Sequence, residues 1–359
     1  MIHGVEQAVV LVGGEGTRLR PLTNRRPKPL LPVLGRPCVE YSLRSLSAAG
    51  IGRVYLACGY RSDAIVHSLG NGSSFGVNMT YAFEDVPMGT AGAVKLLEPK
   101  LDDTFVVVMG DTLMDIDLAA IIKAHKRTEA TVTIALTEVD RPTEFGIVGL
   151  DDAGRIVRFK EKPKAEEVFS NLINAGVYVI QREAFEHVPA NTKFDFSKNL
   201  FPKLLEEGYA LFGSKLSGMW KDIGRPTDLL DANIMMAERR GTELSIPGAK
   251  SSGKILAGEI TAEGAEIAGP AYFGEGVEIA ARASISTSAI GARCKIGARS
   301  VVSGSLLLSG TTLGEGVVVE DSIVGDGCLV ADGVSLERCV LGDGVTVTAA
   351  KRHRDLVLE

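Results

Sequence analysis

Two patterns of apolar residues divide the chain of 359 residues. In the first two thirds, short β-branched runs alternate with helical patterns, and the runs at 8–12, 54–57, 105–109 and 131–136 predict buried strands. Between the first two runs, Val39, Leu43 and Leu46 recur at helical spacing until Gly50, which predicts a helix. This alternation predicts βαβ units, hence an α/β domain with a Rossmann-like, mostly parallel sheet and ligands beyond its carboxyl edge.

From about residue 253 a 17-residue repeat replaces this alternation. Its rows align three columns of large apolar residues, which are Phe273, Ile290, Leu307, Val324 and Leu341; Ile279, Ile296, Leu313, Val330 and Val347; and Ile285, Val302, Val319 and Leu336. Three inward corners in each row predict a triangular parallel β-helix built from hexapeptide repeats. We therefore expect an α/β domain over residues 1–240, a linker over 241–252 and a β-helix over 253–359.

Composition excludes several classes of protein. The formal net charge of −6 argues against wide capture of nucleic acid or anionic membrane, because both need a surplus of Lys and Arg. The longest apolar runs fall far short of the roughly 20 residues of a membrane helix. Five cysteines without a C-x-x-C pair favour reduced thiols that serve packing, so we expect a cytoplasmic protein that binds neither nucleic acid nor membrane.

The segment 13–18, Gly-Gly-Glu-Gly-Thr-Arg, follows the first predicted strand. Glycines there let the backbone approach a phosphate closely. The segment does not match the Walker pattern, because no Gly-Lys-Ser/Thr follows, nor the dinucleotide fingerprint, because Leu19 occupies the place of its third glycine. The cations Arg18, Arg20 and Lys28 lie within a dozen residues, so a phosphate-binding loop is favoured over a turn with solvated charges.

Several ordered motifs, spread over nearly the whole chain, resemble the sugar-1-phosphate nucleotidyltransferase family and especially its mannose-1-phosphate guanylyltransferase branch. They are the loop above, Glu84 with the segment Pro-Met-Gly-Thr-Ala-Gly at 87–92, Met-Gly-Asp at 109–111, Phe-Gly at 145–146, Glu-Lys-Pro at 161–163, Asn-Ala-Gly at 174–176 and Trp-Lys-Asp-Ile-Gly at 220–224. That branch carries a C-terminal hexapeptide β-helix, which the resemblance makes left-handed.

The resemblance implies attack by a sugar 1-phosphate on the α-phosphorus of a nucleoside triphosphate (NTP), with release of pyrophosphate. It assigns Mg²⁺ to Asp111 and Asp222, since magnesium prefers carboxylate and phosphate oxygens. Arg18 would neutralise the departing phosphates, Lys28 would act near the α-phosphate, and Lys162 would hold the sugar phosphate. These five residues are the expected catalytic set.

By the same resemblance, two groups of residues bind the substrates. Carboxylate, amide and backbone groups are what a polyhydroxylated ring can hydrogen-bond. The sugar set is therefore Gly146, Glu161, Lys162 and Asn174. The nucleotide set is Leu11, Gly13, Gly14, Gly16, Thr17, Arg18, Glu84, Gly89, Thr90 and Asp111.

Glu84 bears on the choice of base. Thymidylyltransferase relatives carry Gln at this position, whereas a carboxylate only accepts hydrogen bonds and suits the adjacent N1–H and N2–H donors of guanine. We therefore expect GTP and, by resemblance, mannose 1-phosphate. UTP or dTTP with glucose 1-phosphate or another sugar-like 1-phosphate stays open.

Two other functions stay open. One is a non-catalytic regulatory homologue that binds a nucleotide sugar, and the other is a bifunctional enzyme with an acetyltransferase β-helix. Parallel β-helices expose flat faces that commonly pack against copies of themselves, so we expect a homodimer or homotetramer.

Overall fold

The computed structural model describes residues 4–59, 61–348 and 351–359, and the chain forms two compact units. The first unit contains the chain up to Gly14 together with residues 38–221. The second contains residues 15–37 together with 222–359. The domain boundaries expected from the sequence, 1–240, 241–252 and 253–359, stay a prediction. They cut the chain into consecutive segments, whereas each compact unit combines two separate segments.

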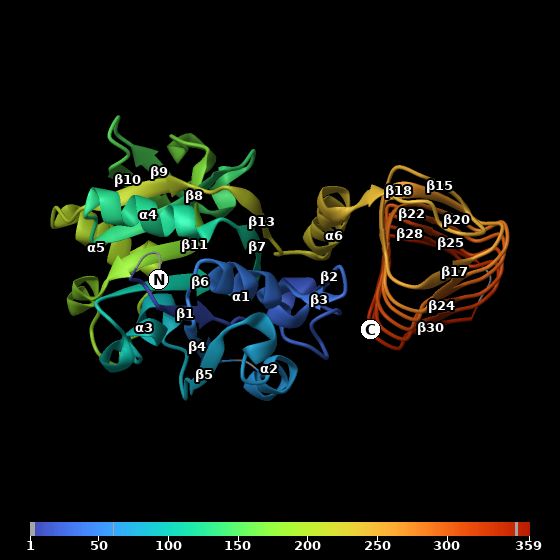
Figure 1. Cartoon of the computed structure of the whole chain (residues 1–359), viewed down its shortest axis with the longest axis horizontal. Helices are drawn as coiled ribbons and strands as arrows, with labels where there is room; N and C mark the ends of the chain where they lie inside the picture. The colour runs from blue at the N-terminus through green and yellow to red at the C-terminus, as the bar shows by residue number, and fades with distance from the viewer. Residues whose placement is uncertain (1–3, 60, 349–350) are drawn as a thin grey trace. The chain divides into compact units, whose positions relative to one another are not determined.

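A single mixed sheet forms the centre of the first unit (Figure 1). In the described residues its strand order is β10-β9-β11-β6-β1-β4-β5, with β8 beside β11 and β12 beside β8. The strands are β1 Gln7–Leu11, β4 Arg53–Cys58, β5 Asn78–Phe83, β6 Thr104–Met109, β8 Val132–Glu138, β9 Gly146–Leu150, β10 Ile156–Glu161, β11 Leu172–Gln181 and β12 Leu211–Lys215.

Strands β6, β1, β4 and β5 run parallel to one another, and β12 runs parallel to β8. Strand β11 runs antiparallel to β6, β8 and β9. All four runs predicted as strands lie in the sheet, and the α/β fold is confirmed. The helices of this unit are α1 Cys38–Ala48, α2 Ser62–Leu69, α3 Gly89–Lys95, α4 Leu118–Thr128 and α5 Phe201–Glu206. Outside the sheet, β7 Thr112–Ile116 pairs with β13 Gly218–Asp222.

Helix α1 shows why the apolar spacing predicted it. Val39, Leu43 and Leu46 are fully buried along one face, as residues three and four apart on a helix must be. Gly50 has φ of +83°, and the N–H of Ile51 bonds back to the carbonyl of Leu46. This left-handed residue ends the helix where the sequence predicted.

The 17-residue repeat forms the coils of a parallel β-helix in the second unit. Ile279 pairs with Ile296, which pairs with Leu313, and the other two predicted columns pair in the same register. Its strands are β15 Lys250–Ser252, β16 Lys254–Ala257, β17 Ile260–Ala262, β18 Glu266–Phe273, β19 Val277–Ile279, β20 Ser284–Ile290, β21 Lys295–Ile296, β22 Val301–Ser303, β23 Leu306–Leu307, β24 Thr312–Leu313, β25 Val318–Glu320, β26 Ile323–Val324, β27 Leu329–Val330, β28 Ser335–Glu337, β29 Val340–Leu341, β30 Thr346–Val347, β31 Arg352–Arg354 and β32 Val357–Leu358.

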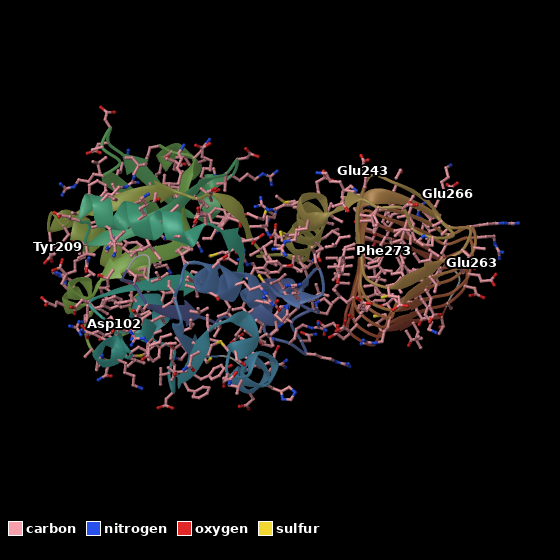
Figure 2. The ribbon with its side chains drawn as sticks, in the orientation of Figure 1. Asp102, Tyr209, Glu243, Glu263, Glu266 and Phe273 are labelled. Atoms are coloured by element: carbon pink, nitrogen blue, oxygen red, sulfur yellow. The ribbon has the colours of Figure 1, made fainter. Side chains whose placement is uncertain are left out.

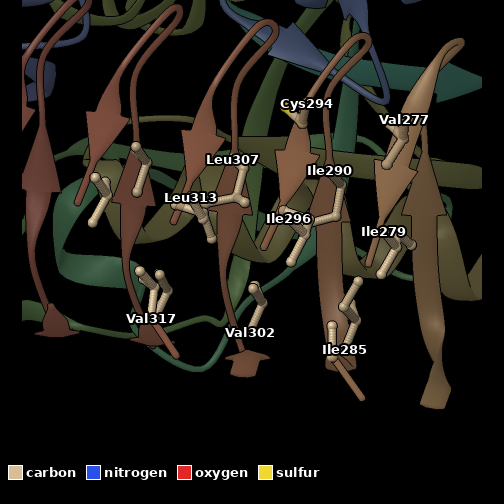
Figure 3. Close-up of a cluster of buried hydrophobic side chains, with 14 of the residues drawn as sticks. Val277, Ile279, Ile285, Ile290, Cys294, Ile296, Val302, Leu307, Leu313 and Val317 are labelled. Atoms are coloured by element: carbon tan, nitrogen blue, oxygen red, sulfur yellow. The ribbon is translucent and has the colours of Figure 1, made fainter. Parts of the chain in front are cut away.

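The predicted columns line the interior of the coils. Ile279, Ile296 and Leu313 follow one another in successive coils (Figure 3). Phe273 points inward, while Glu263 and Glu266 lie outside (Figure 2). Cys294 and Cys328 are buried in the same core, and all five cysteines are free thiols. Burial raises the pKa of Cys294 to about 12, so this thiol is a packing group, as expected.

The basic residues at 352–354 are part of the β-helix. Residues 352–354 form β31, where His353 pairs with Leu336 of β28. In the next strand, β32, Leu358 pairs with Leu341 of β29. Glu337 accepts hydrogen bonds from Arg354 and two other arginines, which lowers the pKa of this carboxyl to about 2. The 17-residue register continues here, with His353 following Leu336 in one column and Leu358 following Leu341 in another.

The segment 15–37 folds into two short 3-10 turns, η1 Thr17–Leu19 and η2 Lys28–Leu30, and a small hairpin, β2 Pro32–Val33 with β3 Arg36–Pro37. Helix α6, Pro226–Arg240, holds this segment through Asn233, which is 1% exposed. The Asn233 amide accepts from the N–H of Leu34 at 2.8 Å and donates to the carbonyl of Pro32 at 3.1 Å. In the part of the chain that the structure describes, no helix is both long and apolar enough to cross a membrane.

Candidate active site

Glycine 14 and Asp111 meet at the carboxyl edge of the parallel strands in the first unit. A Cβ on Gly14 would lie 4.0 Å from Oδ2 of Asp111, so the loop after β1 passes beside this carboxylate. Gly110 makes the approach possible, because its N–H bonds to the carbonyl of Leu11 at 2.9 Å and a Cβ there would lie 2.6 Å from Val12. Leu11 is therefore a buried strand residue that positions the loop through its carbonyl.

Glu84 follows the edge strand β5, and its carboxylate is already anchored. Its Oε2 accepts the N–H of Met88 at 3.0 Å, which fixes the side chain across the loop between β5 and α3. Burial raises the pKa of Glu84, and the bond from Met88 opposes that shift. The second oxygen, Oε1, remains as an acceptor of fixed orientation.

The glycines of the motif at 87–92 allow close packing in the first unit. Gly89 has φ of +74°, and a Cβ there would lie 2.8 Å from the carbonyl oxygen of Phe194. Thr90 takes part in this contact, because its Oγ1 accepts the N–H of Phe196 at 2.9 Å. These two residues of the predicted nucleotide set thus hold the loop that carries Glu84 against residues 194–196.

The expected sugar-binding residues Gly146, Glu161 and Lys162 gather where β9 and β10 pair. A Cβ on Gly146 would lie 2.8 Å from Oε2 of Glu161, so the glycine leaves room for this carboxylate. Burial raises the pKa of Glu161, and the charges of Lys162 and Lys198 oppose the shift. Lys162 has φ of +45°, a left-handed conformation that costs a non-glycine residue free energy and recurs at functional sites.

Asn174 lies on β11, and protein groups occupy most of its amide. Its Nδ2 donates to the hydroxyl of Tyr178 and to Oγ of Ser197, both at 3.0 Å, and its Oδ1 accepts the N–H of Gly176 at 2.9 Å. Ser197 also hydrogen-bonds to Glu161. Sequence reasoning missed Ser197 and Lys198, which lie in no motif used above, because only the folded chain brings them to Glu161.

The second unit brings the remaining predicted catalytic residues together. Lys28 is 8% exposed, and its Nζ lies 3.6 Å from Oδ1 of Asp222. A Cβ on Gly224 would lie 3.0 Å from Oδ2 of Asp222 and 3.3 Å from Nη2 of Arg18. Two cations and one carboxylate therefore converge on the backbone at residue 224, as a site for a phosphate and its counterion requires.

The loop residues Gly16 and Thr17 support this convergence. Gly16 has φ of +64°, and a Cβ there would lie 3.0 Å from Cβ of Lys28. Its carbonyl accepts Oγ1 of Thr23 at 2.9 Å, and Thr17 begins η1, which carries Arg18. Across residues 4–59, 61–348 and 351–359, no three His, Cys, Asp or Glu side chains cluster as a metal site.

Comparison with known proteins covers both parts of the chain. Residues 7–239 match the Nucleotidyl transferase family, and residues 257–352 match the EIF2B subunit epsilon LbH domain, in agreement with the left-handed β-helix predicted. A UTP–glucose-1-phosphate uridylyltransferase of Synechocystis sp. is 33% identical over 80% of this chain and 79% of its own length. A mannose-1-phosphate guanylyltransferase of Mycobacterium tuberculosis is 35% identical over 77% of each.

A solved structure supports the same assignment. The crystal structure of HddC from Yersinia pseudotuberculosis, complexed with GMP-PN, is 25% identical, with a TM-score of 0.56. The likeness covers 65% of this chain and all of HddC. With the family match over 7–239, the ordered motifs and the geometry of the two units, the chain belongs to the nucleotidyl transferase family, among its sugar-1-phosphate nucleotidyltransferases.

Proposed function

We propose that this chain transfers GMP from GTP to mannose 1-phosphate, giving GDP-mannose and pyrophosphate. The convergence of Arg18 and Lys28 on Asp222 is the observation that supports the transferase part of this proposal. Burying a lysine costs free energy unless its charge is balanced, either by the neighbouring carboxylate or by a charged ligand. The anchored carboxylate of Glu84 carries the choice of guanine. The relatives are divided between guanylyl and uridylyl transfer, so their names do not choose the base.

In the proposed mechanism a phosphate oxygen of the sugar phosphate attacks the α-phosphorus. The new P–O bond forms as the bond to the β-phosphate breaks, and its electron pair leaves on pyrophosphate. No general base is required, since a phosphate monoester has a second pKa near 6 and is already a nucleophile at neutral pH. The residues therefore bind and neutralise: Lys162 holds the sugar phosphate, Lys28 the α-phosphate, and Arg18 the departing charge.

We propose Mg²⁺ as the cofactor, and the chemistry of the donors fits it. Asp111 beside Gly14 and Asp222 beside Lys28 each offer a carboxylate next to groups suited to phosphate. The ion would supply charge neutralisation to the triphosphate when bound. Alanine at either position should weaken magnesium-dependent binding of the NTP, measured by calorimetry.

Glu84 would read guanine through Oε1. Guanine presents two adjacent N–H donors, whereas uracil and thymine present a carbonyl on each side of N3–H. The carboxylate can accept hydrogen bonds from the two N–H groups of guanine, but it repels the carbonyl oxygens of uracil and thymine. UTP or dTTP with glucose 1-phosphate is the second candidate, which the Synechocystis relative favours by its name.

Pyrophosphate formation in a matrix of four NTPs against mannose, glucose and glucosamine 1-phosphates tests the proposal. We expect the fastest reaction with GTP and mannose 1-phosphate. A clear preference for UTP or dTTP would refute the assignment of Glu84, and no turnover in any combination would favour the non-catalytic homologue. Acetyl-CoA turnover with an amino-sugar phosphate would instead support the bifunctional alternative.

Two further predictions accompany this function. We propose a homodimer or homotetramer, and light scattering at micromolar concentration that shows a monomer would contradict it. We also propose a cytoplasmic location, which agrees with five buried free thiols and which fractionation of cells would test.

A further inference from the structure

Arg26 connects the segment 15–37 to two successive coils of the β-helix. Its Nη2 contacts Oδ2 of Asp326 and lies 2.8 Å from Oδ2 of Asp343. The two aspartates are 17 residues apart and occupy the same place in adjacent coils. A single guanidinium thus joins both coils to the segment.

Two members of this ion triad are largely removed from solvent, whereas the side chain of Asp326 is 36% exposed. The side chain of Arg26 is 20% exposed and that of Asp343 only 7%. The other oxygen of Asp343, Oδ1, accepts the N–H of Asp326 at 2.9 Å. A bond within the β-helix therefore fixes this carboxylate independently of Arg26. Partly buried, charge-assisted hydrogen bonds of this kind are stronger and more rigid than surface ion pairs.

Other contacts hold the segment at both ends of its length. A Cβ on Gly342 would lie 3.1 Å from Cβ of Pro21, so Pro21 packs directly on the coil next to Asp343. A Cβ on Gly35 would lie 2.7 Å from the hydroxyl of Tyr272 on β18. The β-helix therefore contacts this segment at Pro21 and Gly35 as well as at Arg26.

The segment carries two of the proposed catalytic cations. Lys28 follows Arg26 by two residues, with only Pro27 between them, so little backbone freedom separates the two side chains. Arg18 lies in the other turn, η1, which the hydrogen bond from the N–H of Arg20 to the carbonyl of Thr17 closes at 3.3 Å. Gly16, just before that turn, packs against the side chain of Lys28. A displacement of Arg26 would thus be transmitted to Lys28.

We propose that Asp326 and Asp343 are positioning residues of the transferase: through Arg26 they fix the segment 15–37 and so place Lys28 and Arg18 for catalysis. This inference rests on the proposed function. It gives the β-helix a part in the reaction through residues that lie in none of the transferase motifs.

The test compares the full-length wild type with D326N/D343N, R26Q and the triple variant. Asparagine keeps an Oδ1 acceptor for the N–H of Asp326 but removes both charges. We expect kcat to fall about 10- to 100-fold, as for a misplacement of about 1 Å, while KM for the sugar phosphate changes less than about 2-fold. Because all three variants break one connection, their losses should be equal and not additive.

R299Q/E315Q is the matched control, since this pair is also an ion pair between coils, at 2.6 Å, but more than half exposed. It should keep wild-type kcat. Hydrogen–deuterium exchange gives a readout without turnover: amides of residues 19–31 should exchange faster in D326N/D343N than in the control.

The outcomes separate the two ideas. An active wild type with unchanged kcat in D326N/D343N overturns this inference alone, whatever the exchange data show. Equal losses of kcat in D326N/D343N and in R299Q/E315Q also overturn it. Breaking any ion pair between coils would then lower kcat, and the contact with Arg26 would have no special part. A wild type that forms no pyrophosphate with any substrate pair refutes the proposed function, and the inference about catalysis falls with it.

Discussion

The substitution Glu84→Gln isolates the group that we propose reads the base. In the structure, Oε2 of Glu84 accepts the N–H of Met88 at 3.0 Å. The amide oxygen of glutamine can keep this bond, so the side chain should stay in place. Its NH₂ then takes the position of Oε1, and an acceptor becomes a donor.

The magnitude follows from that exchange. Guanine loses a hydrogen bond to a charged group, worth about 1.5–3 kcal/mol. This corresponds to a fall in kcat/KM for GTP of roughly 10- to 150-fold at 1.36 kcal/mol per factor of ten. UTP and dTTP should gain, because the NH₂ can donate to a carbonyl oxygen that the carboxylate repels.

The assay is pyrophosphate release with saturating mannose 1-phosphate, and the measured quantity is the ratio of kcat/KM for GTP to that for UTP. The neighbouring exposed Asp85→Asn is the control, since it removes the same charge without touching the anchor to Met88. A Glu84→Gln enzyme that keeps the wild-type ratio would refute the reasoning. So would an Asp85→Asn enzyme that shifts the ratio equally, because general charge would then explain the effect.

The same side chain makes a prediction about pH. Burial raises the pKa of Glu84, so its carboxyl takes up a proton at a higher pH than an ordinary glutamate. The preference for GTP should therefore decrease as the pH falls through this raised pKa. In Glu84→Gln the ratio should not depend on pH in that range.

Three other predictions concern catalysis and stability. Lys28→Met should lower kcat about 100- to 1000-fold in the pyrophosphate assay, as loss of a preorganised charge does, and wild-type kcat would exclude the role proposed for Lys28. Gly176→Ala should destabilise the protein by about 2–3 kcal/mol in urea unfolding, because φ is +75° and the new Cβ would lie 2.6 Å from Cγ of Met109; an unchanged midpoint would contradict this. Burial lowers the pKa of His125 from 6.5 to about 4, so the unfolded chain alone binds this proton between these values. The free energy of unfolding should thus fall by about 3 kcal/mol from pH 7 to pH 4, and His125→Gln should lose that part of the dependence.

The β-helix was the most predictable part of the fold. Its columns follow from a fixed period, and the observed pairing of Ile279, Ile296 and Leu313 repeats that period residue by residue. The apolar column that contains Leu336 is interrupted at His353, although the coil continues there. Strands such as β11 were not recognised from the apolar pattern, because only part of their length forms an uninterrupted apolar run.

The site was predictable where residues follow a motif and not where tertiary contacts decide. Asp111 and Lys162 lie at strand ends, as expected of ligand-binding residues in such a sheet. Nothing in the sequence places Ser197 beside Glu161 and Asn174, since the contact joins segments far apart in the chain. Gly89 was expected only in the nucleotide set, and the structure adds that both Gly89 and Gly110 admit neighbouring backbone or side chains.

The division of the chain into its two units has a consequence for how such proteins can be cut and recombined. The chain passes from one unit to the other after residues 14, 37 and 221, so no single cut separates them. Removing everything after residue 240 would leave the sheet whole but strip the segment 15–37 of Tyr272, Asp326 and Asp343. A foreign β-helix joined at residues 241–252 would have to supply new partners for Arg26. Exchange of the C-terminal part between relatives is therefore constrained by residues near the start of the chain.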